Sequence, residues 1–313
     1  MTSPSRKEAR SAKIPTYIRL VRPKHWIKNL FVLAPALFAR ELFHPDMVLV
    51  ALKAFFGFCL TASVVYIIND MADVKADRAH HEKKHRPLAA GTVTSGEALA
   101  LLGVLLVLAM LLALTMPVTY GLILAAYFLI NLAYSYKLKE VILLDVFMIA
   151  AGFMLRVLGG AAAIRVPVSS WIVLCTLFIS LFLGFAKRRS ELVSSHDSGS
   201  ASERRVLMLY SVGFLDQVLT IVAAGAVISY ALYTVAPRTV ETFGTENLIY
   251  TTIFVLFGIF RYLHLIHTSE TTENPTNAVT SDPAILTVVI LWVVTCVLII
   301  YRAQEIWPIV PHS

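Results

Sequence analysis

Apolar runs of about 20 residues recur along almost the whole 313-residue chain. A run of that length crosses roughly 30 Å of hydrocarbon when it forms an α-helix. Hydrophobic residues make up 58% of the chain and charged residues 15%, whereas soluble domains are about half apolar and a quarter charged. The sequence therefore predicts an all-α polytopic membrane protein and excludes a single soluble enzyme.

Apolar length and polar breaks predict nine membrane-spanning helices. They cover residues 27–43, 47–69, 97–116, 118–136, 142–163, 168–186, 212–235, 247–266 and 284–302. The first is short and is interrupted by Pro35 and Arg40, so the alternative for it is an interfacial helix that leads into the second span. The predicted organisation is a basic N-terminal tail, residues 1–24, followed by a single transmembrane domain, residues 25–313.

Basic residues are divided unequally between the two sides of this predicted bundle. Of the 27 Lys and Arg residues, 21 lie on the side of the N-terminus and 5 on the other, and Arg156 lies within a span. An excess of Lys and Arg marks the cytoplasmic side of a membrane protein. We therefore expect an integral protein of the cell (inner) membrane with a cytoplasmic N-terminus. The net charge of +7 then reflects topology, and nucleic acid is not an expected partner.

Acidic residues also gather in or beside the predicted cytoplasmic loops. Carboxylates contribute little to the orientation of a membrane protein, so their concentration needs another reason. We interpret the cytoplasmic face as the working face and expect a polar cavity that opens on that side.

The most informative stretch follows the second predicted span. Asn69, Asp73 and Asp77 recur every four residues, so on a continuing helix they lie on one face, about 6 Å from one to the next. Mg²⁺ prefers hard oxygen ligands and is usually held by one or two carboxylates together with substrate phosphates. This spacing therefore predicts a magnesium site.

Cationic side chains follow this group at a spacing of three residues. They are His80, Lys83 and Arg86. Cationic donors beside a metal and carboxylates suit a diphosphate, whose charge exceeds that of the metal. The alternative is a solvated loop of mixed charge that only ends a helix.

The pattern NDxxDxxxDxxHxxKxxRP, residues 69–87, resembles the first aspartate-rich motif of the UbiA superfamily of intramembrane prenyltransferases. The similarity extends to residues 22–29, 134–139, 144–160 and 187–191. The resemblance implies a nine-helix UbiA-like bundle, which agrees with the predicted span count. It also implies a Mg²⁺-dependent transferase.

The resemblance assigns roles to individual positions of the motif. Asn69, Asp73 and Asp77 match the family's ligands for Mg²⁺ and diphosphate, and Asp70 is adjacent to them. The family's basic residues beside the motif correspond to Lys83 and Arg86 here. The expected catalytic residues are therefore Asp73, Asp77, Lys83 and Arg86.

One departure separates this chain from the aromatic prenyltransferases of the superfamily, which carry a second aspartate-rich motif after the sixth span. Residues 187–191 read KRRSE there, without a DxxxD pattern. A cluster of cations suits a phosphorylated substrate better than a second metal site. The departure favours the branch that moves 5-phosphoribose from phosphoribosyl diphosphate to a polyprenyl phosphate for cell-envelope precursors. A prenyltransferase that moves an isoprenoid to an aromatic acceptor is the alternative, and a transporter is a second one.

Two ionisable residues fall inside or beside one predicted span. Asp145 and Arg156 are eleven residues apart, about three helical turns, and so share a face. A charged residue at the centre of a span costs about 2.5–3.5 kcal/mol on insertion scales and is a candidate for function. We expect Arg156 to reach a phosphate and Asp145 to lie near a ribose hydroxyl or a cation. Alternatively, Arg156 only pairs with a carboxylate of another helix.

Further candidates for substrate binding are basic or aromatic residues at the cytoplasmic ends of spans. They are Lys24, Lys28, Tyr134, Lys137, Lys139, Lys187 and Arg188. Interface anchoring is the alternative for Lys24 and Lys28, because Lys and Trp are common at membrane surfaces. Asp282, which precedes Pro283, is expected to cap the last helix, and closure of the cytoplasmic mouth is the alternative. The sequence is compatible with a homo-oligomer and leaves the prenyl chain length open.

Overall fold

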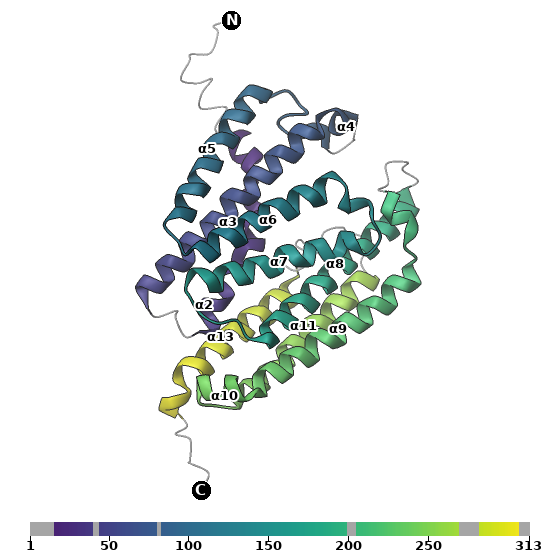
Figure 1. Ribbon diagram of the computed structural model, residues 1–313. Coiled ribbons are helices and arrows are strands. Elements are labelled where there is room, and N and C mark those ends of the chain that lie inside the picture. Colours follow the sequence, from purple (N-terminus) through teal and green to yellow (C-terminus); the bar gives the residue numbers. More distant parts are fainter. Residues whose placement is uncertain (1–15, 40–43, 80–82, 199–204, 269–281, 307–313) are drawn as a thin grey trace, which may run out of the picture. The chain divides into compact units, whose positions relative to one another are not determined.

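Figure 1 shows the computed structural model, which describes residues 16–39, 44–79, 83–198, 205–268 and 282–306. Helices form the regular structure of these described residues, which contain no β-strand. The long helices are α3 (Pro45–Ala72), α5 (Ser95–Leu114), α6 (Val118–Tyr136), α7 (Leu144–Ala163), α8 (Ser170–Ser198), α9 (Val212–Val235), α11 (Thr252–Thr268) and α13 (Pro283–Ile306). The short elements are η1 (Pro23–Leu33), α2 (Ala34–Phe38), α4 (Val74–Ala79), η2 (Lys83–His85), η3 (Leu138–Glu140), η4 (Arg205–Leu209), α10 (Pro237–Phe243) and η5 (Asn247–Thr251).

Eight helical segments of the described residues are long and apolar enough to cross a membrane. They are the eight long helices, with η5 and α11 forming one segment from Asn247 to Thr268. A helix pairs its backbone N–H and C=O groups internally, which is necessary because hydrocarbon offers them no hydrogen-bond partner. The prediction of an integral, all-helical membrane protein is confirmed.

The nine-helix count is not confirmed, because the first predicted span takes another form. In this stretch the 3-10 helix η1 ends at Leu33, and α2, which has five residues, ends at Phe38. Pro35 has no N–H group, so a regular α-helical ladder cannot run from η1 through α2. Residues 40–43 lie outside the described residues. The expected cytoplasm-facing cavity stays a prediction.

The chain divides into two compact units. The first contains the described residues of Met1–Ala36, Leu42–Tyr136 and Leu155–Pro167, and the second contains those of Leu37–Glu41, Lys137–Met154 and Val168–Ser313. Helix α7 contributes its first half, residues 144–154, to the second unit and residues 155–163 to the first.

The first unit is organised around α3, which packs along α5 and also contacts η1 and α6 (Figure 1). The aromatic ring of Phe58 lies against Tyr120 and Tyr127 in the core between α3 and α6. Gly160 of α7 approaches η1 so closely that a Cβ there would lie 1.9 Å from the carbonyl oxygen of Val32. Only glycine fits this contact.

The second unit is organised around α8 and α9, which pack along each other, with α11 against α9 and α13 against α11 (Figure 1). The rings of Phe182 and Tyr262 meet in its core at a centroid distance of 5.4 Å. Asp282 caps α13 as predicted, because its Oδ1 accepts a hydrogen bond from the backbone N–H of Ile285 at 2.8 Å. Arg261 of α11 also donates to Asp282, from Nη2 to Oδ2 at 2.8 Å, which ties the two helices together.

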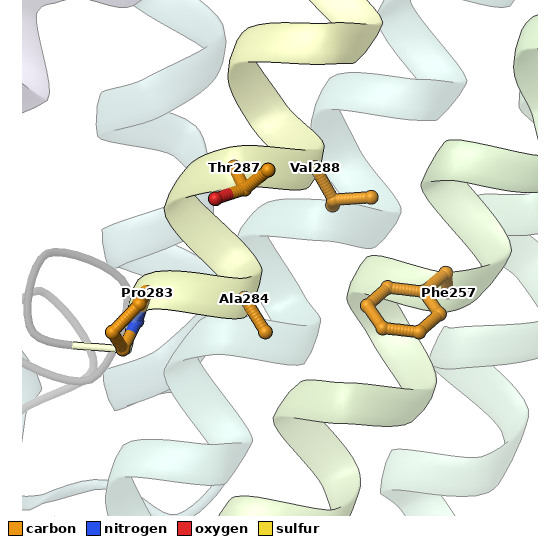
Figure 2. Close-up of a pocket in the computed structure, with 5 residues that line it drawn as sticks. All are labelled: Phe257, Pro283, Ala284, Thr287 and Val288. Carbon is orange, nitrogen blue, oxygen red and sulfur yellow. The ribbon is translucent and has the colours of Figure 1, made fainter.

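An open cavity of about 410 Å³ lies between α11 and α13 in the second unit (Figure 2). Phe257 of α11 faces Ala284 and Val288 of α13, and Pro283 and Thr287 complete the lining. None of these lining side chains is charged. The lining is mostly apolar, so the cavity suits apolar chains better than a phosphorylated substrate.

Candidate functional site

The predicted magnesium ligands lie where α3 passes into α4. Helix α3 ends at Ala72, and Asp73 is its C-cap with φ −91° and ψ 4°. The backbone N–H of Asp73 nevertheless bonds the carbonyl of Asn69 at 2.9 Å, and that of Asp77 bonds the carbonyl of Asp73 at 2.8 Å. The three residues therefore remain one turn apart across the junction, as the spacing predicted.

Arginines from two distant segments neutralise the carboxylates of this junction. Arg86 donates from Nη1 to Oδ2 of Asp77 at 2.8 Å and to Oδ1 of Asp70 at 3.1 Å. Arg22, which precedes η1, donates to the same Oδ1 of Asp70, and its guanidinium lies 5.3 Å from the ring centroid of Tyr66. Asp70 and Asp77 are both buried. The result is a chain of alternating charges, Arg22 to Asp70 to Arg86 to Asp77, which we call the aspartate–arginine cluster.

Some oxygen ligands of this region remain for a metal. Oδ2 of Asp70 is buried and has no hydrogen-bond partner among the described residues. Asp73 is half-buried at the helix junction, one turn from Asn69. Within the described residues, no three or more His, Cys, Asp and Glu side chains gather as a metal site of their own. The donor set fits a Mg²⁺ ion that is shared with a substrate diphosphate, since Mg²⁺ commonly takes only one or two protein carboxylates.

Other predicted residues of the first unit lie on short 3-10 helices. Lys83 begins η2 and is half-buried, whereas Lys24 is exposed and Lys28 half-buried on η1. The indole N–H of Trp26 fixes η1 to α3 through the hydroxyl oxygen of Ser63 at 3.1 Å. His80 lies outside the described residues.

Arg156 is buried in the first unit and contacts neutral oxygens. It donates from Nε to Oδ1 of Asn29 at 2.7 Å and from Nη2 to the hydroxyl of Tyr127 at 2.8 Å. Its guanidinium also lies 4.7 Å from the ring centroid of Tyr127. The amide nitrogen of Asn29 in turn donates to Sγ of Cys59 at 3.2 Å. These contacts connect α7 with η1, α3 and α6.

Asp145 belongs to the second unit and has different partners from Arg156. Its Oδ2 accepts from Nε of Arg188 at 2.5 Å, and its Oδ1 accepts from the hydroxyl of Tyr210 at 2.8 Å. Arg188 is fully buried and also donates from Nη1 to Glu191. The two predicted residues Asp145 and Arg188 are therefore brought together, each with its charge compensated.

The remaining basic candidates are spread over both units. Nζ of Lys187, on α8, lies 3.6 Å from Oε1 of Glu191. Lys137, exposed, and Lys139, half-buried, flank the start of η3 in the second unit, whereas Tyr134 of α6 belongs to the first. No ion pair joins Lys137 or Lys139 to another residue that the structure describes.

Arg22 and Tyr210 bond to predicted site residues but were not themselves predicted. Arg22 is the first residue of the stretch 22–29, which carries part of the family resemblance. That resemblance could have identified Arg22 as a site residue. Tyr210 had no signal in the sequence, because its partners Leu143 and Asp145 are 67 and 65 residues away.

Comparisons with known proteins find a matching family model and relatives that are similar over about two thirds of the chain. The model of the UbiA prenyltransferase family matches residues 29–281. A decaprenyl-phosphate phosphoribosyltransferase from Mycolicibacterium smegmatis is 38% identical over 220 residues, which cover 69% of each chain. A protein of the same name from Corynebacterium glutamicum is 35% identical over 69% of this chain and 66% of its own.

A solved structure supports the fold. The UbiA homolog from Archaeoglobus fulgidus, bound to GPP and Mg²⁺, matches with a TM-score of 0.67. The match covers 91% of this chain and 99% of that one at 17% sequence identity. The prediction of a UbiA-like fold is therefore confirmed, apart from the number of helices.

Proposed function

The chain belongs to the UbiA prenyltransferase family, and we propose that it transfers 5-phosphoribose from phosphoribosyl diphosphate to a polyprenyl phosphate. The observation that carries this proposal is the 38% identity to a decaprenyl-phosphate phosphoribosyltransferase over about two thirds of both chains. The product would be a lipid-linked sugar precursor for the cell envelope. We place the reaction at the cytoplasmic side of the cell membrane, in a single transmembrane domain of residues 25–313 that follows a basic tail, residues 1–24.

Asn69, Asp73 and Asp77 are proposed to hold Mg²⁺ together with the diphosphate of the donor. Three features support this: their register across the junction of α3 and α4, the unpartnered buried oxygen of Asp70, and the Mg²⁺ bound by the fold neighbour. When bound, the ion neutralises charge on the leaving diphosphate. Asp70 holds Arg22 and Arg86 beside these ligands.

The reaction needs positioned cations more than a general base. An oxygen of the polyprenyl phosphate gives an electron pair to the anomeric carbon, while the bond from that carbon to diphosphate breaks and its electrons leave with diphosphate. A phosphate monoester is already anionic at neutral pH. Lys83 and Arg86 are proposed to stabilise the leaving diphosphate, because charge grows there in an oxocarbenium-like transition state.

The acceptor phosphate is proposed to bind the basic residues outside this cluster. We assign Lys137 and Lys139 to it, because neither forms an ion pair with another described residue. Lys24, Lys28, His80, Tyr134, Arg156 and Lys187 stay predicted substrate contacts.

The test uses membranes that contain the full-length protein, radiolabelled phosphoribosyl diphosphate, polyprenyl phosphate and Mg²⁺. We expect label to move into the organic phase, and we expect chelation of Mg²⁺ or the change Asp73→Ala to abolish this movement. Asp46→Ala is the matched control, because Asp46 is an exposed carboxylate at the other end of the same helix. No lipid labelling, combined with transfer of an isoprenoid from a prenyl diphosphate to an aromatic acid, would show a prenyltransferase instead.

A further inference from the structure

We propose that Tyr210, Asp145 and Arg188 form a positioning network that fixes the basic segment 137–143 in the shape needed to bind the acceptor phosphate. This inference rests on the proposed function, which assigns Lys137 and Lys139 of that segment to the acceptor. All of these residues belong to the second unit. Arg188 and Asp145 then act through the segment and do not themselves contact substrate.

The segment ends in a strained turn. Leu143 has a φ of 64°, a left-handed conformation that a bulky side chain rarely adopts. The backbone N–H of Leu144 bonds the carbonyl of Ile142 at 2.8 Å, which makes Leu143 the centre of a γ-turn. A γ-turn with positive φ persists only where surrounding contacts hold it.

Tyr210 supplies such a contact. Its hydroxyl oxygen accepts a hydrogen bond from the backbone N–H of Leu143 at 2.7 Å, and the same hydroxyl donates to Oδ1 of Asp145 at 2.8 Å. Burial raises the pKa of Tyr210, so the hydroxyl keeps the proton that it donates. The ring is buried and stacked on Phe214, with an angle of 24° between the two rings. The phenol is therefore a fixed bridge between the turn and Asp145.

Arg188 fixes the other side of Asp145. The guanidinium is fully buried and donates from Nε to Oδ2 of Asp145 at 2.5 Å and from Nη1 to Glu191. Both oxygens of Asp145 are thus held, one by α8 and one by Tyr210. A fully buried arginine between two carboxylates suits a positioning role better than recognition of a phosphate.

The backbone transmits this constraint to the two lysines. The N–H of Asp145 bonds the carbonyl of Val141 at 3.1 Å, and the N–H of Val141 bonds the carbonyl of Leu138 at 3.3 Å. Leu138 lies between Lys137 and Lys139. The turn at Leu143 is therefore linked through the backbone to the peptide that carries both lysines.

The experiment compares Tyr210→Phe with the double variant Tyr210→Phe/Leu143→Gly in the full-length protein. Loss of the hydroxyl is expected to raise the KM for polyprenyl phosphate roughly tenfold with little change in kcat, and to speed amide hydrogen exchange in residues 137–144. Glycine adopts positive φ freely, so in the double variant the KM and the exchange rate should both return toward those of the unaltered protein. Tyr250→Phe is the control, because Tyr250 is an exposed tyrosine of the same unit.

Each outcome decides the inference. Faster exchange and higher KM in Tyr210→Phe, both reduced again by Leu143→Gly, would support it. Exchange and kinetics in Tyr210→Phe that match Tyr250→Phe would overturn it, as would faster exchange without any change in KM. If the unaltered protein labels no polyprenyl phosphate, the proposed function fails. In that case the role in binding the acceptor fails with it, and exchange tests only whether the network holds residues 137–143 in shape: faster exchange in Tyr210→Phe supports that part, and unchanged exchange overturns it.

Discussion

Arg86 reaches back across nine residues to Asp77, with Nη1 of the guanidinium 2.8 Å from Oδ2 of the carboxylate. The same nitrogen lies 3.1 Å from Oδ1 of Asp70, so one cation serves two buried carboxylates. A buried carboxylate that loses its cation bears the full cost of its desolvation. Arg86 therefore stabilises the fold of the aspartate–arginine cluster, in addition to its proposed contact with diphosphate.

The change Arg86→Gln is expected to lower both stability and transfer activity. Removal of the guanidinium leaves Asp77 without its partner and Asp70 with Arg22 only, at a cost of about 1–3 kcal/mol in the free energy of unfolding. The midpoint of thermal unfolding in detergent measures this cost. Lys84→Gln is the matched control, because Lys84 is exposed and lies two residues away. Equal midpoints for the two variants would contradict the structural role of Arg86.

A second prediction concerns the contact between α7 and η1. Gly160→Ala would place a Cβ 1.9 Å from the backbone carbonyl oxygen of Val32, which cannot rotate away. We therefore expect the free energy of unfolding to fall by about 3 kcal/mol or more. Gly103→Ala provides the comparison, since a Cβ at Gly103 meets no atom within 4 Å. That change should be neutral or stabilise α5 by about 0.5–1 kcal/mol. Similar unfolding midpoints for both alanine variants would show that η1 does not pack on Gly160 in this way.

The sequence predicted those parts of the fold that depend on local composition. Eight of the nine expected spans appear as long helices, because their apolar length alone requires them. The register of Asn69, Asp73 and Asp77 was also predictable, since a spacing of four residues is a local property of a helix. The expected first span was different, because Pro35 and the 3-10 form of η1 interrupt it.

The partners of the site residues were not predictable from one sequence. Arg22 and Asp70 are 48 residues apart, and Asn29 and Arg156 are 127 residues apart. Such pairs depend on how helices pack, which periodicity does not determine. Asp145 and Arg156 share one helix, yet each bonds to residues of a different unit. Their common face therefore gave no information about their partners.

A third prediction tests the buried contacts of Arg156. Asn29→Ala removes the oxygen that accepts from Nε of Arg156 and the amide that donates to Cys59. Because the guanidinium is buried, we expect the free energy of unfolding to fall by about 2–3 kcal/mol. In the double variant Asn29→Ala/Arg156→Leu the two losses should not add, since the same hydrogen bond is removed twice. Unfolding midpoints of the single and double variants give the coupling. Asn131→Ala is the control, because the side chain of Asn131 donates to the backbone carbonyl of Tyr127 in its own helix, α6. Strictly additive losses in the free energy of unfolding would show that Asn29 and Arg156 do not interact.

The last prediction concerns pH and the cap of α13. The hydrogen bond from Arg261, together with that from the backbone N–H of Ile285, holds the pKa of Asp282 below its ordinary value of 3.8. Because the folded state favours the carboxylate, its stabilisation is present above that value and is lost as the pH falls through the lower pKa of the folded protein. Asp282→Asn keeps a capping side chain but removes the charge, so it should unfold at a lower temperature than the unaltered protein at about pH 7. The difference should shrink toward zero below about pH 4, whereas a difference that stays constant down to about pH 3 would show that the charge of Asp282 does not tie α13 to α11.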